Sequence, residues 1–311
     1  MSLKEEYPLV IIGGGPAGLT ASIYASRYRV DHLIAAVSIG GSANEAHRVE
    51  NWPGINQISG TELMQNMWNH AKVYTPDFYS SDVKKITKED QGFEIHLTDQ
   101  KVKTKSIVFA GGTEYRRLSV PGESDFLGRG VSYCATCDGG FFKGKTVAVI
   151  GGANSAIMAA VELSQNCEKI YLIYRGEELK GETIWIEKVK NNEKIITLPL
   201  TNLLKIEGGN KVERVILDKE YQGKTDLALD GVFIEIGTSP MARLVENLGV
   251  DLDDKGAIKI NNFGETSLKG FFAAGDVTNG SGGFRQIITA SAEGAVAARG
   301  VFEYLKGNKF I

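Results

Sequence analysis

Cysteine is scarce in this sequence: its 311 residues include three, Cys134, Cys137 and Cys167. So few cysteines exclude the disulfide framework of a small secreted protein, and in a reducing compartment a disulfide is more often catalytic than structural. Long apolar runs are missing too, since nowhere do about 18 apolar residues follow one another, and the charged start MSLKEEYP is unlike a secretory signal. We therefore expect a cytoplasmic protein without a membrane segment.

An excess of charge of one sign is absent as well. The sequence has 35 Lys and Arg residues against 38 Asp and Glu residues, which leaves a net charge of −3. Such a balance supplies no basic surface for nucleic acid. The chain is longer than the usual limit of a single core, so we expect two domains.

Glycine, by contrast, is abundant, with 37 residues. The stretch VIIGGGPAG ends a β-branched run in clustered glycines and opens onto a helical pattern, which predicts strand, turn and helix. Its spacing, Gly13-x-Gly15-x-x-Gly18, is that of a dinucleotide-binding fingerprint, in which the glycines make the turn, admit a pyrophosphate and let the helix pack on the strand. The alternative is a glycine-rich turn without a ligand, which any α/β protein can contain.

The chain repeats this pattern. The stretch VAVIGGANSA again predicts strand, turn and helix, with Gly151, Ala153 and Ala156 in the three glycine positions. A second strand pattern follows each turn, at 31–36 and 169–175, and completes a βαβ unit. We therefore expect an α/β fold with two Rossmann-like dinucleotide-binding domains.

A third glycine cluster, GFFAAGDV, ends a strand pattern with Gly275 and Asp276, and a long helix pattern follows it. A carboxylate at a strand end can accept hydrogen bonds from a polyol, which makes Asp276 a candidate ligand-binding residue. The alternative is a turn or cap residue, a frequent role of Asp after Gly.

Cys134 and Cys137 form a Cys-x-x-Cys pair followed by Asp138. A zinc site needs four ligands, and because the sequence offers no second closely spaced pair, we expect no metal site. We expect Cys167 to be a small buried hydrophobe. A Cys-x-x-Cys pair lowers the pKa of one thiol and closes a readily reduced disulfide, so redox chemistry is favoured for it. The scattered residues that do not complete a zinc site are Cys167, His32, His47, His70 and His96.

Taken in chain order, these motifs resemble those of the low-molecular-weight bacterial-type thioredoxin reductases, which are FAD-dependent pyridine nucleotide-disulfide oxidoreductases. The resemblance implies an FAD-binding domain made of residues 1–117 and 246–311, with a nicotinamide-type domain, 118–245, inserted between them. It also implies a thioredoxin-like protein as partner and a homodimer. The motifs that carry it are GGGPAG at 13–18, ENWPG at 50–54, GRGVSYCATCDG at 128–139, GGANSA at 151–156, EIGTSP at 235–240, and FAAGDV with FRQ at 272–286.

The resemblance implies a role for each residue of the redox segment. Cys137 would take electrons from the flavin, Cys134 would attack the disulfide of the partner protein, and Asp138 would serve as acid and base for the released thiolate. A helix N-cap is the alternative role for Asp138. In this family the pair cannot face flavin and partner at once, so the inserted domain is expected to rotate.

The resemblance also implies a set of FAD contacts, although Ser42 and Gly111 differ from the residues usual in the family. These candidates are Gly13, Gly15, Pro16, Ala17, Gly18, Gly40, Gly41, Ser42, Asn51, Val83, Ala110, Gly111, Gly275, Asp276, Arg285, Gln286 and Ile287.

The second glycine motif departs from the family. Ala153 replaces the glycine that gives the pyrophosphate room, and the stretch YRGEELKGE carries a charge of −1 where the family has arginines for the 2′-phosphate of NADPH. We expect weak NADPH binding, unless backbone contacts preserve it. The candidate nicotinamide contacts are Gly152, Ala153, Asn154, Ser155 and Arg175; the charged residues of the stretch are Arg175, Lys180, Glu177, Glu178 and Glu182.

These motifs are compatible with three functions. The leading one is an FAD-dependent thioredoxin-disulfide reductase. The first alternative is the same chemistry fed by NADH, reduced ferredoxin or another flavin. The second is a redox-sensing flavoprotein without catalysis, against which the intact Cys134, Cys137 and Asp138 speak.

Overall fold

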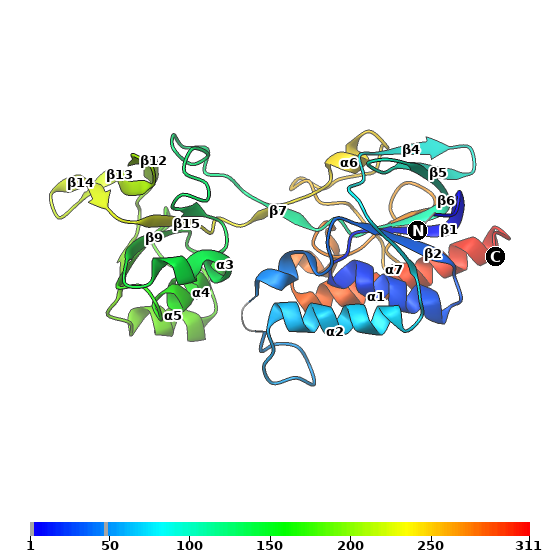
Figure 1. Ribbon diagram of the computed structural model, residues 1–311, viewed down its shortest axis with the longest axis horizontal. Helices are drawn as coiled ribbons and strands as arrows, with labels where there is room; N and C mark the ends of the chain where they lie inside the picture. The colour runs from blue at the N-terminus through cyan, green and yellow to red at the C-terminus, as the bar shows by residue number, and fades with distance from the viewer. Residues whose placement is uncertain (1–2, 47–48) are drawn as a thin grey trace. The chain divides into compact units, whose positions relative to one another are not determined.

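The computed structural model describes residues 3–46 and 49–311, so His47 lies outside the description. The chain divides into two compact units, drawn in Figure 1. Unit 1 consists of Met1–Glu114 and Ser239–Ile311, and unit 2 of Tyr115–Thr238. Unit 2 is therefore inserted into the sequence of unit 1.

Unit 1 is built on a seven-stranded sheet in the order β3-β2-β1-β6-β5-β4, with β17 paired to β6. Strands β3, β2, β1, β6 and β17 run parallel to one another. Strands β4 and β5 form an antiparallel hairpin at one edge, and β5 pairs antiparallel with β6. The bounds are β1 Glu6–Ile12, β2 His32–Ala36, β3 Asp77–Ser80, β4 Lys85–Glu89, β5 Gly92–His96, β6 Lys101–Phe109 and β17 Phe271–Ala273.

The helices of unit 1 start from the motifs that the sequence singled out. Helix α1 begins at Pro16, where the fixed φ of proline suits the first helical position, with Gly15 as its N-cap. Helix α7 lies along α1 (Figure 1), and this approach depends on glycine, because a Cβ on Gly294 would lie 2.1 Å from the carbonyl oxygen of Ala17. The bounds are α1 Pro16–Arg27, η1 Gly41–Glu45, α2 Gly60–Lys72, α6 Arg243–Glu246, η3 Gly280–Gly283 and α7 Ile287–Gly307.

Unit 2 has a five-stranded parallel sheet in the order β11-β10-β9-β15-β8 and a separate antiparallel sheet, β12-β13-β14. The central strands are buried apolar runs, typical of a parallel sheet covered on both faces. The bounds are β8 Val131–Ser132, α3 Ala135–Asp138, η2 Gly139–Phe142, β9 Thr146–Ile150, α4 Asn154–Leu163, β10 Lys169–Ile173, α5 Thr183–Lys190, β11 Ile195–Leu198, β12 Leu203–Gly208, β13 Val212–Tyr221, β14 Lys224–Ala228 and β15 Gly231–Ile234.

Two strands carry the chain between the units and pair with each other: β7, Thr113–Tyr115, and β16, Thr238–Pro240. The family resemblance implied a later second crossing, after residue 245. Ala242 and Val245 are buried in the core of unit 1, so the chain already belongs to unit 1 from Ser239 onward. The α/β class with parallel sheets, predicted from the two glycine motifs, is confirmed.

No helix within residues 3–46 and 49–311 combines the length and the apolar character needed to cross a membrane.

Candidate flavin, redox and nucleotide sites

The first glycine turn contains two kinds of glycine. Gly13 has a φ of +120°, and a Cβ there would lie 2.2 Å from the carbonyl oxygen of Ala110. A Cβ on Gly18 would lie 2.0 Å from the carbonyl oxygen of Gly13, so both residues are required by packing within the protein. A Cβ on Gly15 would meet nothing closer than the Gly40 carbonyl oxygen at 3.8 Å. Gly15 therefore leaves open space at the N-terminus of α1, as the approach of a pyrophosphate requires.

The Gly275-Asp276 turn packs onto this first turn of α1. A Cβ on Gly275 would lie 2.9 Å from the Cβ of Ala17. The turn is fixed by Glu293 of α7, whose Oε2 accepts hydrogen bonds from the Gly275 backbone N–H at 2.9 Å and the Thr278 hydroxyl at 2.7 Å. Sequence reasoning missed Glu293, because only the tertiary contact distinguishes it from other helical glutamates.

The carboxyl group of Asp276 is half-buried in this turn. Burial raises the pKa of Asp276 above its ordinary value, the charge of Glu293 acts in the same direction, and the guanidinium of Arg285 opposes the shift. A buried carboxylate gains most from a ligand that donates hydrogen bonds to it, and the hydroxyl groups of a ribityl or ribose chain have that chemistry.

Two other predicted flavin-binding segments meet at the start of α7. The side-chain Nδ2 of Asn51 donates to Oε1 of Gln286 at 2.9 Å. Gln286 is the N-cap of α7 and forms a reciprocal capping box with Thr289. Ile287 packs against a small apolar cluster that includes Ala43 and Met64. The helix N-terminus, a favourable place for electron-rich groups, is thereby fixed beside the ENWPG segment.

The remaining flavin candidates all lie in unit 1, but the structure does not join all of them to these turns. The Gly40 N–H donates to the Gly14 carbonyl at 2.7 Å, which brings the segment around Gly41 to the first turn. Ser42 is exposed on η1, and the side chain of Val83 belongs to the core cluster of Val10 and Ile12. The space at Gly15 and the carboxylate of Asp276 fit the pyrophosphate and a hydroxyl-bearing chain of a dinucleotide such as FAD.

In unit 2, Cys134 is disulfide-bonded, whereas Cys167 is free and buried in an apolar cluster, as the sequence predicted. The side chain of Cys137 lies outside the described part of the chain. The Ser132 hydroxyl accepts from the Cys134 N–H at 3.0 Å and donates to the Cys134 carbonyl oxygen at 3.2 Å. Ser132 thus fixes the backbone at the entry to α3.

Asp138 is the last residue of α3 and the N-cap position of η2, but its side chain makes no capping hydrogen bond there. Asp138 therefore does not serve as a helix cap in this structure.

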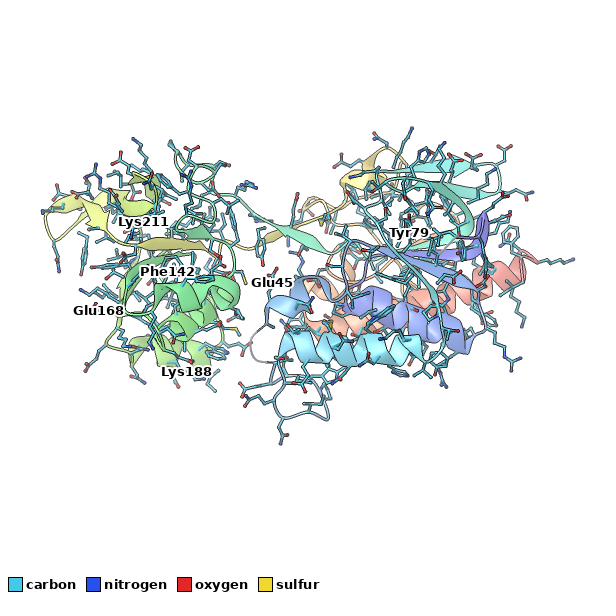
Figure 2. The ribbon with its side chains drawn as sticks, viewed as in Figure 1. Glu45, Tyr79, Phe142, Glu168, Lys188 and Lys211 are labelled. Carbon is cyan, nitrogen blue, oxygen red and sulfur yellow. The ribbon has the colours of Figure 1, made fainter. Side chains whose placement is uncertain are left out.

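Phe142, the last residue of η2, is labelled in Figure 2. Its ring packs edge-on against that of Phe233, with 5.2 Å between the ring centroids.

A buried carboxylate supports the residue before Cys134. Glu123 is 2% exposed and accepts hydrogen bonds from the backbone N–H groups of Leu118 and Ser119 and from the Tyr133 hydroxyl. Burial, together with this hydrogen bond, raises the pKa of Tyr133 to about 12. The guanidinium of Arg117 lies over the Tyr133 ring at 5.7 Å. No local motif in the sequence indicates this arrangement.

The second glycine turn opens into a cavity of about 630 Å³ within unit 2. Four of the five predicted nicotinamide contacts line it: Gly152, Ala153, Ser155 and Arg175. Asn154 instead accepts a hydrogen bond from the Glu182 backbone N–H at 2.8 Å. Ala153 is exposed and has an ordinary φ of −108°, so alanine is not strained there.

The charge of this cavity differs from that of the YRGEELKGE stretch. Four cationic side chains line it, from Arg116, Arg117, Arg175 and Lys180, against the carboxylates of Glu178 and Glu235. Arg116 and Arg117 come from the segment after β7, so the sum of charges over the YRGEELKGE stretch does not include them. The cavity therefore carries a net positive charge, although a single arginine, Arg175, lies at the end of β10.

Comparisons with known proteins agree with this geometry. The pyridine nucleotide-disulphide oxidoreductase family matches residues 7–294. The thioredoxin reductase of Bacillus subtilis (strain 168) is 37% identical over 309 residues, which cover 98% of this chain and 97% of that protein. The crystal structure of Lactococcus lactis thioredoxin reductase (FR conformation) superposes with a TM-score of 0.91 at 34% identity, over 97% of this chain and 99% of that one. A ferredoxin-flavin thioredoxin reductase of Clostridium acetobutylicum is 27% identical, with a TM-score of 0.55, over 99% and 100% of the two chains.

Proposed function

The chain belongs to the pyridine nucleotide-disulphide oxidoreductase family, and on this premise we propose that it is an FAD-dependent thioredoxin reductase. The observation that carries the proposal is the disulfide of Cys134, the residue before α3, whose last residue is Asp138. Bound FAD supplies two-electron chemistry, taking an electron pair from a donor and passing it to a disulfide. Unit 1 would hold it through the turn at Gly15, the carboxylate of Asp276 and the start of α7.

The residues of the redox segment then perform thiol–disulfide exchange. In this proposal Cys137 receives the electrons, so that the pair becomes a dithiol. The Cys134 thiolate attacks one sulfur of the thioredoxin disulfide, whose S–S bond breaks as a mixed disulfide forms. The Cys137 thiolate next attacks the Cys134 sulfur, which restores the disulfide of the pair and releases thioredoxin. Thioredoxin gains the two electrons and the two protons that the dithiol loses, and Asp138 passes one of these protons from the pair to the released thiolate of thioredoxin.

The test separates the disulfide chemistry from the question of the donor. The purified protein is reduced anaerobically with dithionite, excess reductant is removed, and oxidised thioredoxin is added. We expect the oxidised flavin absorbance to return while four thioredoxin thiols appear per flavin, two from the electron pair of the reduced flavin and two from that of the dithiol. A reduced protein that leaves the thioredoxin disulfide intact would refute the proposal.

A second candidate function shares this chemistry but uses a donor other than NADPH. Ala153 lines the cavity at the glycine position that admits a pyrophosphate, which NADH and NADPH share, so it favours an electron-carrying protein over either nucleotide. Glu178 also lines the cavity and disfavours a 2′-phosphate, which favours NADH over NADPH. The similarity to a protein named ferredoxin-flavin thioredoxin reductase makes reduced ferredoxin a concrete choice. Anaerobic mixing with NADPH, NADH and reduced ferredoxin in turn, followed by flavin bleaching, distinguishes the three.

The proposal includes a homodimer and a cytoplasmic location. The dimer follows from the family resemblance, and light scattering of the purified protein tests it. The location follows from the scarcity of cysteine and from the need of a dithiol catalyst for a reducing compartment.

A further inference from the structure

A carboxylate is hydrogen-bonded to the interior of the Cys-x-x-Cys pair. Thr136, which stands between Cys134 and Cys137, donates from Oγ1 to Oε2 of Glu162 at 2.9 Å. Thr136 belongs to α3, and Glu162 lies in the last turn of α4. Both residues are half-buried. Glu162 is thus separated from the redox pair by one side-chain contact.

The position of Glu162 is set by packing. Ala135, Ala159 and Leu163 belong to one buried apolar cluster, which joins α3 to α4. The end of α4 also approaches the segment after the pair, because a Cβ on Gly139 would lie 2.9 Å from Cδ2 of Leu163. This packing places the backbone of Glu162 beside the turn, and the hydrogen bond from Thr136 holds its carboxylate there.

The elements packed on α3 bring no positive charge to balance this carboxylate. They are chiefly α4 and η2. Glu162 is the only charged residue in the sequence of α4, η2 has none, and Asp138 is the only charged residue of α3 itself. The cation that contacts place at the end of α4 is Lys194, whose Nζ donates to the carbonyl oxygens of Ser164 at 2.9 Å and Cys167 at 3.1 Å. Within the described part of the chain, no ion pair that includes Glu162 is found.

We propose that Glu162 is a positioning residue of the redox pair. Through Thr136 it holds the turn of the pair on α4, and its charge disfavours the thiolate relative to the thiol. A negative charge that destabilises the thiolate form of the reduced pair makes the dithiol a stronger reductant. The opposite holds for disulfides that are strong oxidants, because their reduced form is stabilised. This inference rests on the proposed function, since it assigns Glu162 a part in electron delivery by Cys134 and Cys137.

The first test measures the ionisation of the pair without flavin turnover. The protein is reduced with dithiothreitol and alkylated with iodoacetamide at a series of pH values, and the tryptic peptide with Cys134 and Cys137 is quantified apart from that with Cys167. In Glu162→Gln, which keeps the hydrogen-bond acceptor and removes the charge, we expect the half-maximal rate to move to a pH lower by roughly half a unit to one unit. In redox equilibrium with glutathione, the dithiol fraction of the pair should rise about three- to tenfold.

Matched variants separate charge from position. Glu162→Asp keeps the charge, so its pH profile should stay near that of the unaltered protein. Thr136→Val removes the hydrogen-bond donor, and in that background Glu162→Gln should have a smaller effect than alone, because the two residues act as one unit. Glu168→Gln removes the same charge from an exposed site that lies, in Figure 2, at the far edge of unit 2 from α3, and should change nothing.

A Glu162→Gln profile that coincides with that of the unaltered, correctly folded protein would overturn the inference, as would an equal shift in Glu168→Gln. Failure of the proposed function looks different. A protein in which Glu162→Gln shifts the profile, but which never reduces thioredoxin, supports the role of Glu162 and refutes the reductase.

Discussion

Asn51 and Gln286, which are 235 positions apart in the sequence, are joined by a side-chain hydrogen bond of 2.9 Å. The bond ties the ENWPG segment to the N-cap of α7 and so fixes one end of the helix whose other contacts hold the Gly275-Asp276 turn. Two motifs that are remote in sequence, ENWPG and the Gly275-Asp276 turn, are therefore held by one helix of unit 1.

The protein should be yellow and contain one FAD per chain, and Gly15 and Gly18 should respond differently to substitution. Gly15→Ala places its methyl group in open space, so the free energy of unfolding should change little while FAD affinity falls about tenfold. Gly18→Ala drives a Cβ against the Gly13 carbonyl and should destabilise the fold itself. Flavin titration and thermal unfolding of the FAD-free proteins measure both; similar loss of stability in the two variants would contradict the assignment.

The parts of the fold that the sequence predicts are those with local signals. The Gly13 and Gly151 turns, their strands and helices, and the start of α7 after Gln286 all follow from spacing along the chain. The β12-β13-β14 sheet and the crossing at β16 have no such signal, because their pairing is decided by contacts between distant segments.

The same limit applies to the candidate sites. The Cys-x-x-Cys pair and Asp276 are recognisable from sequence, since their neighbours form motifs. Glu293 and Glu162 are single residues in helices, and only packing against a distant turn gives them a role. Arg116 is a similar case, because the charge of the cavity is summed over segments that are remote in sequence.

The two cysteines of the redox pair should be inequivalent. Cys134→Ser should retain reduction of the flavin by its donor and lose thioredoxin turnover, because the attacking thiol is missing. Cys137→Ser should lose turnover as well, because the remaining Cys134 thiol has no partner with which to form the disulfide that receives electrons from the flavin. Stopped-flow flavin reduction and a thioredoxin turnover assay measure the two steps separately, and thioredoxin turnover retained in either variant would rule out the assigned roles.

The ionised carboxylate of Asp276 should lower the free energy of unfolding of the FAD-free protein. Its pKa is raised by burial above the ordinary value of 3.8, so the folded state binds a proton more tightly than the unfolded state does. Stability therefore declines as pH rises from about that ordinary value through the higher folded value, and the loss persists at neutral pH. FAD-free Asp276→Asn should melt about 2 °C higher than the FAD-free parent at pH 7 and lose this pH dependence, while it binds FAD more weakly. A lower melting temperature, with the pH dependence retained, would show that burial of the charge is not the dominant effect.

The residues that line the cavity of unit 2 bear on which electron donor the protein uses. Ala153 and Glu178 weaken the site for NADPH, whereas Arg116, Arg117, Arg175 and Lys180 give the cavity a net positive charge. The combined substitutions Ala153→Gly, Gly176→Arg and Lys180→Arg should therefore raise NADPH affinity by about tenfold to a hundredfold, since each added charged hydrogen bond to a phosphate is worth roughly 1.5–3 kcal/mol.

The backbone accepts this change, because a Cβ on Gly176 would meet nothing nearer than the Glu178 carbonyl oxygen at 3.4 Å. Rates of flavin bleaching by NADPH and by NADH measure the effect, and the ratio between the two donors should move toward NADPH. The matched control is Lys188→Arg on α5, outside the cavity, which should leave the ratio unchanged. If the unaltered protein is already reduced rapidly at micromolar NADPH, the cations from the segment after β7 have replaced the arginines missing near Arg175, and Arg116→Ala should then abolish that affinity.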